Sequence, residues 1–196
     1  MSKTYYDTPL WDSSLSIEER LDYLLSEMTL EEKIQSMGTG NPEIERLGVP
    51  AFQVGGEAAH GVQARHDQKF DDNEPDLTTI FQNPIGMSAS FDEELIRKAG
   101  KVVGTEVRGL YSREHKGSLS VWAPTIDMER DPRWGRTEEA YGEDPLLTGK
   151  MAGAYVEGLQ GEDDHYLLTA ATLKHFYANN VEEGRVWKSS TVSPRN

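Results

Sequence analysis

Residues 118–145 read SLSVWAPTIDMERDPRWGRTEEAYGEDP, and this stretch decides how the rest of the chain is interpreted. Its first part, residues 118–123, is an apolar run that is typical of a buried strand. Residues 127–145 follow directly and place three arginines among acidic side chains and two aromatic ones. Functional polar side chains are often found in a segment that follows a buried strand. We therefore expect residues 127–145 to form one wall of a binding pocket.

Two other parts of the sequence repeat this pattern of an apolar run followed by a polar loop. Residues 49–54 (VPAFQV) precede GGEAAHG, and residues 167–173 (LLTAATL) precede KHFYANN. Between the three runs lie two segments with apolar residues at helical spacing. One begins after Asp92 and the other at Asp144-Pro145, a helix cap with proline at the first helical position.

The resulting order of strand, helix, strand, helix, strand predicts an α/β fold of parallel strands joined by crossover helices. The expected buried faces of the two helices are Leu95, Ile96, Ala99, Val102, Val103 and Val107, then Leu147, Met151, Ala154, Tyr155, Val156 and Leu159. In such folds ligands bind at the carboxyl ends of the strands, so the three polar loops should converge on one site.

The first third of the sequence is organised differently. Residues 1–14 are polar and aromatic without a period, which is typical of a surface arm. Ser16-Ile-Glu-Glu19 and Thr29-Leu-Glu-Glu32 have the form of capping boxes and predict two short helices. Leu21, Leu24, Leu25 and Met28 then recur at helical spacing in the first of them.

Composition limits the classes of partner. The 196 residues carry 20 basic and 34 acidic side chains, a net charge of −14, which repels nucleic acid and anionic membranes. A neutral or cationic ligand fits this charge. The sequence has no cysteine, which excludes disulfides and cysteine-ligated zinc. No signal peptide or spanning segment is visible, so the expected location is the cytoplasm.

The loop after residue 54 offers one candidate ligand-binding carboxylate. Glu57 could accept hydrogen bonds from two neighbouring hydroxyls of a sugar, and an ordinary role as a solvated, capping acid is about equally plausible from composition. His60, four residues after Gly56, is expected to be structural and bonded to the backbone.

In residues 127–145 two arginines compete as ligand donors, Arg133 and Arg136. The rigid fork of a guanidinium suits vicinal hydroxyls or a buried carboxylate. Five nearby acids could instead hold the arginines in a salt-bridge network, and at least one arginine should serve it. These acids are Asp127, Asp131, Glu138, Glu139 and Asp144. Trp134 could be a platform for a sugar ring or an anchor in the core.

Lys174 and His175 stand at the end of the third apolar run, where a cation is costly unless it has a partner. Adjacent side chains of a regular strand point to opposite faces. Both can reach one pocket only if the backbone kinks or contains a cis peptide bond, which is rare outside proline.

Other chemistries lack support in the sequence. It contains no phosphate loop, no dinucleotide-type Gly-x-Gly-x-x-Gly and no Gly-x-Ser-x-Gly. The five histidines show no helical or close pairing, so we expect no metal site. No cofactor is expected.

Three segments together resemble a known family. Residues 57–62 (EAAHGV), residues 123–145 and residues 173–176 (LKHF) look like glycoside hydrolase family 3, and the long middle motif is highly specific. The resemblance runs from about Leu15 onward. It implies a partial TIM-type (β/α) barrel, here about the first three strands with their crossover helices, and cofactor-free hydrolysis of terminal β-linked glucose or xylose with retention.

The resemblance also implies four glycone-binding residues, which are Glu57, Arg136, Lys174 and His175. Two departures qualify the substrate. The continuation Tyr177-Ala-Asn-Asn180 disfavours the β-N-acetylglucosaminidase branch. Many glucosidases have aspartate where this sequence has Glu57, and the extra methylene leans modestly towards a pentose.

Retaining hydrolysis needs two carboxyl groups about 5–5.5 Å apart. By the resemblance, the nucleophile and the acid/base lie beyond residue 196, so no catalytic residue is expected within residues 1–196. We therefore expect the N-terminal part of a family-3 barrel domain that is inactive alone, with a small oligosaccharide or β-glycoside as ligand. Self-association or a downstream chain should cover its open edge. The alternatives are a non-catalytic carbohydrate-binding module and an inactive truncated product.

Overall fold

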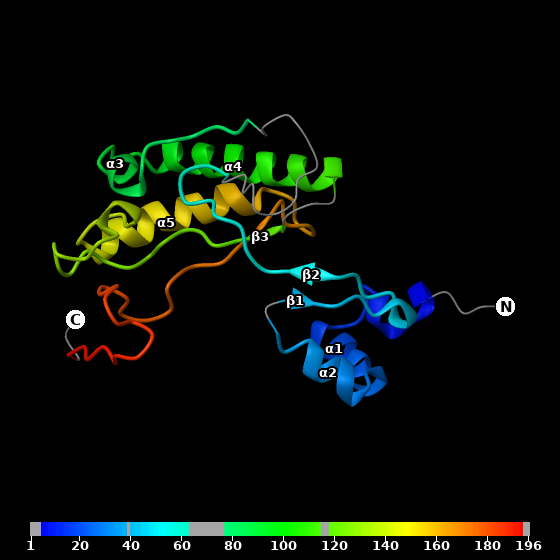
Figure 1. Ribbon diagram of the computed structural model, residues 1–196. Coiled ribbons are helices and arrows are strands. Elements are labelled where there is room, and N and C mark those ends of the chain that lie inside the picture. The colour runs from blue at the N-terminus through cyan, green and yellow to red at the C-terminus, as the bar shows by residue number, and fades with distance from the viewer. Residues whose placement is uncertain (1–4, 39, 63–76, 115–117, 194–196) are drawn as a thin grey trace. The chain divides into compact units, whose positions relative to one another are not determined.

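The computed structural model describes residues 5–38, 40–62, 77–114 and 118–193, and the chain forms two compact units, Met1–Val54 and Gly55–Asn196. Figure 1 shows their secondary structure, a mixture of helices and short strands. Among the described residues no helix is long and apolar enough to cross a membrane.

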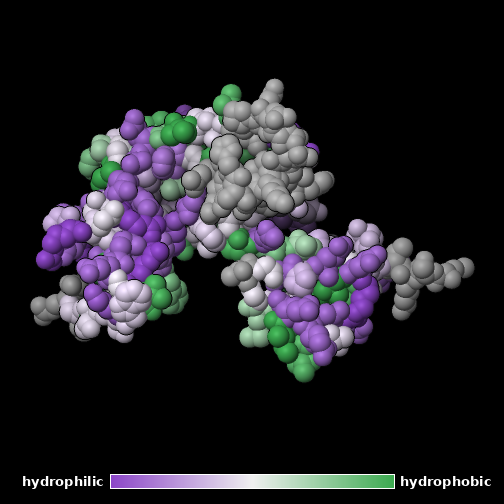
Figure 2. Space-filling model, in the orientation of Figure 1, coloured by the Kyte–Doolittle hydropathy of each residue, from purple (hydrophilic) through white to green (hydrophobic). Residues whose placement is uncertain are grey.

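The first unit is built from locally capped helices. Helices α1 (Ile17–Glu27) and α2 (Leu30–Gln35) both begin with complete capping boxes, as predicted. Ser16 accepts from the Glu19 amide and Thr29 from the Glu32 amide, while each glutamate returns a bond to the backbone of its cap. Neither helix buries a side chain. The expected apolar stripe of α1 therefore does not form a core, and Figure 2 shows hydrophobic surface over this part of the unit.

The first predicted strand differs from expectation. Within residues 49–54 only Phe52–Gln53 form a regular strand, β2, and it pairs antiparallel with β1 (Gly40–Asn41). The reason lies in the connection, because Ile44 and Val49 exchange two backbone hydrogen bonds and close a tight turn. Antiparallel strands can be joined by such a short turn, whereas parallel strands need a long crossover.

The chain reaches the parallel strands of the second unit just after β2. Strand β3 (Ser120–Val121) pairs in parallel with β4 (Ala170–Ala171). On the other side of β3, the amide of Gly55 donates to the Ser120 carbonyl at 3.3 Å and the Trp122 amide donates to the Gly56 carbonyl at 2.8 Å. Three segments thus lie side by side in sequence order. The described part forms an α/β fold without a closed barrel.

Two long helices supply the core of the second unit. Helix α4 (Glu93–Glu114) is capped by Asp92, helix α5 (Pro145–Gln160) by Asp144, and the two pack side by side (Figure 1). A shorter helix, α3 (Pro84–Ser88), precedes them. The hydrophobic residues of α4 and α5 that form this core are Ile96, Ala99, Val103, Val107, Met151, Ala152, Ala154, Tyr155 and Leu159. Leu95 and Val102, predicted to be buried, are 50% and 39% exposed, because they lie at the margins of the stripe.

Glycines allow the backbones of α4 and α5 to approach closely. A Cβ atom on Gly158 would lie 2.1 Å from the carbonyl oxygen of Arg97, and one on Gly100 would lie 2.5 Å from that of Tyr155. Real Cβ atoms essentially never approach other heavy atoms below 3.0 Å. Any side chain at these positions would therefore push the helices apart.

Candidate functional site

The segments that follow the three side-by-side stretches converge, as the sequence predicted. The Lys174 amide donates to the Pro124 carbonyl at 3.2 Å, and the Lys174 carbonyl accepts from Ile126 at 2.8 Å. Glu57, Arg136 and Lys174 then line one cavity of about 510 Å³. The loop that carries Glu57 is anchored by the buried hydroxyl of Tyr155, which donates to the Ala58 carbonyl at 2.5 Å.

Lys174 has the partner that a cation in this position requires. Its Nζ lies 3.0 Å and 3.3 Å from the two carboxylate oxygens of Glu57. A second carboxylate, that of Glu139, lies 3.9 Å from the same nitrogen. The lysine side chain is only 13% exposed and that of Glu57 is 34% exposed. Lys174 therefore sits between two carboxylates at the inner side of the cavity.

Arg136 is held by Glu139 in a two-point ion pair. The Nε and one terminal nitrogen of Arg136 donate to the two oxygens of Glu139 at 2.7 Å and 2.6 Å. These hydrogen bonds raise the pKa of Arg136 above its ordinary value. Burial raises the pKa of Glu139, but the hydrogen bonds from Arg136 and the charges of Arg136, Lys174 and His175 outweigh burial, so this pKa lies below its usual range. Glu139 is consequently ionised at neutral pH.

Glu182 completes this wall from a distant part of the sequence. One of its oxygens accepts from the indole of Trp134 at 3.0 Å, and the other lies 3.7 Å from Arg136. Trp134 is 3% exposed. The tryptophan is therefore an anchor within the wall, and its ring is not open as a platform for a sugar.

His175 is directed by Asp127. The carboxylate oxygen Oδ2 of Asp127 lies 2.7 Å from the ring nitrogen Nδ1 of His175 and accepts from the His175 amide at 3.1 Å. The Asp127 side chain is 4% exposed, so this interaction is shielded from water. The Lys174–His175 peptide bond is cis, one of the two arrangements that the sequence required for both residues to reach the site.

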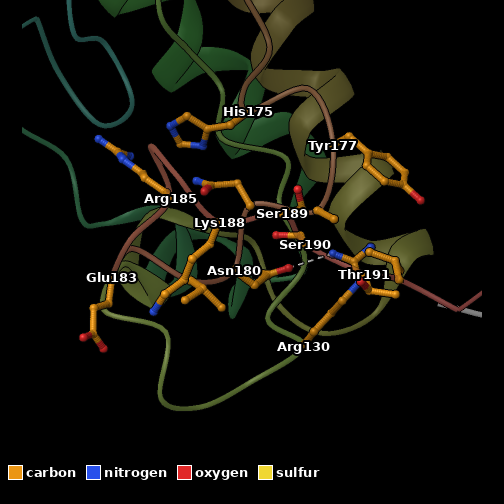
Figure 3. A pocket seen from close by; sticks show the side chains of 14 residues that line it. Arg130, His175, Tyr177, Asn180, Glu183, Arg185, Lys188, Ser189, Ser190 and Thr191 are labelled. Carbon is orange, nitrogen blue, oxygen red and sulfur yellow. Dashed lines mark hydrogen bonds between the residues drawn. The ribbon is translucent and has the colours of Figure 1, made fainter.

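Lys174 and His175 nevertheless line different cavities. Lys174 lines the cavity with Glu57 and Arg136, whereas His175 lines a second cavity of about 870 Å³ formed largely by residues 177–192. Figure 3 shows this second cavity. The four expected glycone contacts therefore border two neighbouring spaces.

The remaining sequence candidates have structural roles. The side chain of Arg133 is 88% exposed and pairs with Asp131, so both arginines have acidic partners and only Arg136 also lines the cavity. The pairing with Arg133 lowers the pKa of Asp131 to about 2. His60 binds backbone as expected, with Nδ1 3.2 Å from the Phe81 carbonyl, although it also borders the smaller cavity.

Sequence reasoning missed two residues of the site. Asp127 was grouped with the general network, while the structure pairs it specifically with His175. Glu182 lies in a polar stretch without a period, where nothing in the sequence distinguishes it from its neighbour Glu183. Its role arises from a long-range contact, which local patterns do not encode.

The cluster can recognise hydroxyl groups. Around the smaller cavity, the carboxylates of Glu57 and Glu139 accept hydrogen bonds, while Lys174 and Arg136 donate them. The two carboxylates and two cations of this cluster balance, and Glu138 adds one further negative charge to the cavity, which favours an uncharged polyol ligand over an anion. In the described ranges no group of three or more histidine or acidic side chains could hold a metal ion.

Comparison with known proteins identifies the family. Residues 29–194 match the family model of the glycosyl hydrolase family 3 N-terminal domain. The chain belongs to glycosyl hydrolase family 3. The three motifs that resemble this family, residues 57–62, 123–145 and 173–176, all lie within the matched region.

Curated family-3 relatives include β-xylosidases. The chain is 39% identical over 178 residues to an exo-1,4-β-xylosidase of Emericella nidulans. It is 42% identical over 181 residues to a β-xylosidase/α-L-arabinofuranosidase of Medicago sativa subsp. varia. Each match covers 90% of this chain and 23% of the relative, so the chain spans about a quarter of the length of these relatives.

Solved family-3 structures share the fold. A GH3 exo-β-xylosidase in complex with a xylobiose aziridine activity-based probe matches with a TM-score of 0.80 and 34% identity, over 92% of this chain and 23% of that one. β-Glucosidase 3B of Thermotoga neapolitana in complex with α-D-glucose matches with a TM-score of 0.68 and 31% identity, over 83% of this chain and 24% of that one.

Proposed function

We propose that the chain supplies glycone-binding residues to a retaining β-glycosidase that removes terminal β-linked xylose or glucose. The observation that carries this proposal is the charge-balanced cluster of Glu57, Lys174, Glu139 and Arg136 around one cavity in a family-3 chain. Glu57, Arg136 and Lys174 contact the sugar from the smaller cavity, and His175 contacts it from the adjoining side.

Xylose is the favoured glycone. Glu57 extends one methylene further than aspartate into the cavity and leaves less room for the hydroxymethyl group of a hexose. The β-xylosidase names of the relatives described above support the same preference. The second unit is proposed to form the first part of a TIM-type barrel, with the segment at residues 55–56, β3 and β4 as its first strands.

The residues of the cluster are suited to binding and not to bond cleavage. A general acid must carry a proton at the working pH, but the pKa of Glu139 is lowered by its cations. Glu57 is held by Lys174, and Glu139 by Arg136. Neither carboxylate is free to act as a nucleophile. We therefore expect residues 1–196 to bind the glycone and to show no turnover of nitrophenyl β-xyloside.

A binding experiment tests the first part of the proposal. Methyl β-D-xyloside added to the ¹⁵N-labelled chain should shift the amide signals of residues around Glu57 and Lys174. Glu57→Gln should weaken this binding roughly tenfold, because a charge-assisted hydrogen bond contributes about 1.5–3 kcal/mol. Glu138→Gln is the matched control, since Glu138 borders the same cavity without a charge partner in the described structure. Equal weakening by both variants would contradict the assignment.

A chimaera tests the enzymatic part and separates it from a non-catalytic sugar-binding module. Residues 29–194 would replace the matched region of the Emericella nidulans β-xylosidase. Hydrolysis of nitrophenyl β-xyloside by this chimaera, lost on Glu57→Gln, supports a piece of an enzyme. A folded chimaera that binds xyloside without hydrolysing it supports the binding module instead.

A further inference from the structure

The second cavity, of about 870 Å³, carries cations that the glycone cluster does not use. Its lining carries three cations, Arg130, Arg185 and Lys188, one acid, Glu183, and the ring of His175. We call this space the basic cavity. It is a local excess of positive charge in a chain whose net charge is −14. Such a concentration of cations needs an explanation beyond the average composition.

Two of these cations have no acidic partner among the described residues. Arg130 donates to the side-chain oxygen of Asn180 at 3.0 Å, which is a neutral acceptor and is drawn as a dashed line in Figure 3. The amide of Asn180 in turn donates to the Met128 carbonyl at 2.7 Å, so Arg130 is fixed in place. Lys188 makes no ion pair within the described ranges. Both positive charges remain available to a ligand.

The third cation is only partly neutralised. Arg185 lies 2.8 Å from Glu182, but Glu182 is shared with Trp134 and Arg136. Figure 3 shows Arg185 on the same side of the cavity as His175, while the carboxylate of Glu183 is directed away from His175 and Arg130. The interior of the basic cavity is therefore positively charged, and Glu183 does not fill it.

Hydroxyl groups complete the lining. Ser189, Ser190 and Thr191 border the basic cavity together with the cations. Hydroxyls both donate and accept hydrogen bonds, which suits the hydroxyls of a sugar ring, and a guanidinium suits a carboxylate. The volume lies within the range of about 300–1,000 Å³ that is usual for small-molecule sites. A carboxylate-bearing sugar matches this combination better than a simple inorganic anion.

The position of the basic cavity connects it to the glycone site. His175 borders the basic cavity, and the preceding residue, Lys174, borders the smaller one. Resting on the function proposed above, we infer that the basic cavity is a subsite for a uronic acid unit or substituent next to the glycone. The smaller cavity would disfavour such a group, because Glu138 adds a negative charge to a cluster that is otherwise balanced.

Matched sugars test this subsite. Methyl β-D-glucuronide and methyl β-D-glucoside differ only at C6, where one has a carboxylate and the other a hydroxymethyl group. In titrations of the 196-residue chain followed by NMR, the glucuronide should bind roughly tenfold more tightly, as expected for a charge-assisted hydrogen bond. Its signals should map to residues 177–192. Raising NaCl to 1 M should remove most of the difference, because screening shortens the Debye length to about 3 Å.

Variants and competing anions decide the outcome. Arg130→Gln and Lys188→Gln should each weaken glucuronide binding roughly two- to fivefold, as for partly exposed ion pairs, whereas Lys150→Gln should not, because Lys150 pairs with Glu93 on another surface. Equal affinity for both sugars, or no effect of the two variants, would overturn the inference. Inorganic phosphate that binds as tightly as the glucuronide would also overturn it, by showing an anion site without sugar contacts.

The same titrations separate this inference from the proposed function. Methyl β-xyloside that shifts signals near Glu57 while the glucuronide fails would leave the proposed function standing and reject the subsite. The reverse result would reject the glycone site and would leave the basic cavity as a uronate site on its own.

Discussion

The two units of this chain form helices by different means. In the first unit, α1 has a complete capping box and buries none of its eleven residues. In the second unit, α4 is twice as long and contributes four residues to the core, Ile96, Ala99, Val103 and Val107. Local hydrogen bonds are sufficient to begin and end a helix. Burial needs a partner surface, and α4 has one in α5.

The contrast extends to side chains that carry charge. Arg46 of the first unit pairs with Glu32, and the arginine side chain is 46% exposed. Lys174 of the second unit is 13% exposed and is held by two carboxylates. Exposed pairs contribute little to stability, typically about 0–1 kcal/mol. The difference in burial therefore predicts which substitutions matter.

The largest effect is expected at the contact between α4 and α5. Gly158→Ala places a methyl group 2.1 Å from the Arg97 carbonyl oxygen, so the helices must separate, at a cost of about 1–3 kcal/mol or more. Gly153→Ala on the same helix is the control, because nothing lies within 4 Å of its Cβ position. It should stabilise α5 by about 0.5–1 kcal/mol, since alanine favours a helix over glycine.

Urea unfolding monitored by circular dichroism measures both variants. We expect opposite shifts of the unfolding midpoint for the second unit and no change in hydrogen exchange of α1. Similar midpoints for the two glycine variants would show that α4 and α5 do not pack as closely as described.

The second effect separates a buried carboxylate from an exposed one in the same segment. Asp127→Asn removes the shielded charge that directs His175 and should cost roughly 1–3 kcal/mol. It should also change the protonation pattern of the His175 ring nitrogens. Asp131→Asn affects only solvent-exposed contacts, with the guanidinium and the amide of Arg133, and should change stability much less than Asp127→Asn.

Nitrogen NMR of His175 together with thermal unfolding checks this pair of variants. A change in the His175 ring signals that is as large in Asp131→Asn as in Asp127→Asn would disprove the positioning role of Asp127.

The third effect compares the caps of the two units. Ser16→Ala and Asp144→Ala each remove one side-chain bond to a helix amide and should each destabilise by about 1 kcal/mol. The loss at Ser16 should stay local, as faster amide exchange in α1. The loss at Asp144 should lower the unfolding midpoint of the whole second unit, because α5 is part of its core. Global unfolding caused by Ser16→Ala would remove the distinction between the units.

The smallest effect concerns pH. The folded state lowers the pKa of Glu139 below its ordinary value of 4.5. The ion pair with Arg136 therefore stabilises the folded state fully at pH values above 4.5, and this stabilisation is lost as the pH falls through the folded-state pKa. Burial and the nearby Glu143 raise the pKa of Glu129 instead. Carbon NMR of the side-chain carboxyls should therefore find Glu139 titrating below pH 4.5 and Glu129 above it. Equal midpoints for the two groups would contradict the described environment.

The sequence predicted what local chemistry determines. Both capping boxes, both long helices and the convergence of the polar loops follow from residue types and their spacing, whereas the choice of Glu57, Arg136 and Lys174 rested on the family resemblance. The pairing of β2 with β1 could not be predicted in this way, because an apolar run alone does not indicate which strand it pairs with. The turn closed by Ile44 and Val49 determines this pairing.

Long-range contacts explain the other differences. Residue types alone did not separate Arg133 from Arg136, and the family resemblance singled out Arg136; in the structure Arg136 lines the cavity and Arg133 is exposed. The contribution of Glu182 depends on Arg136 and Trp134, which lie 46 and 48 positions away, and no periodic pattern marks it. Likewise, the sequence pattern did not single out Gly100 and Gly158, although they determine how closely α4 and α5 approach.

The hydrogen bond between Trp134 and Glu182 connects the intrinsic fluorescence of a tryptophan to the candidate site. Trp134 is 3% exposed, whereas Trp11, Trp122 and Trp187 are 37%, 37% and 80% exposed. Emission from the buried indole should therefore appear at shorter wavelength than that of the other three. Because Glu182 also lies beside Arg136, a ligand that engages Arg136 should change the polarity around Trp134. We therefore expect ligand binding at the site to change the emission of Trp134, without an added label.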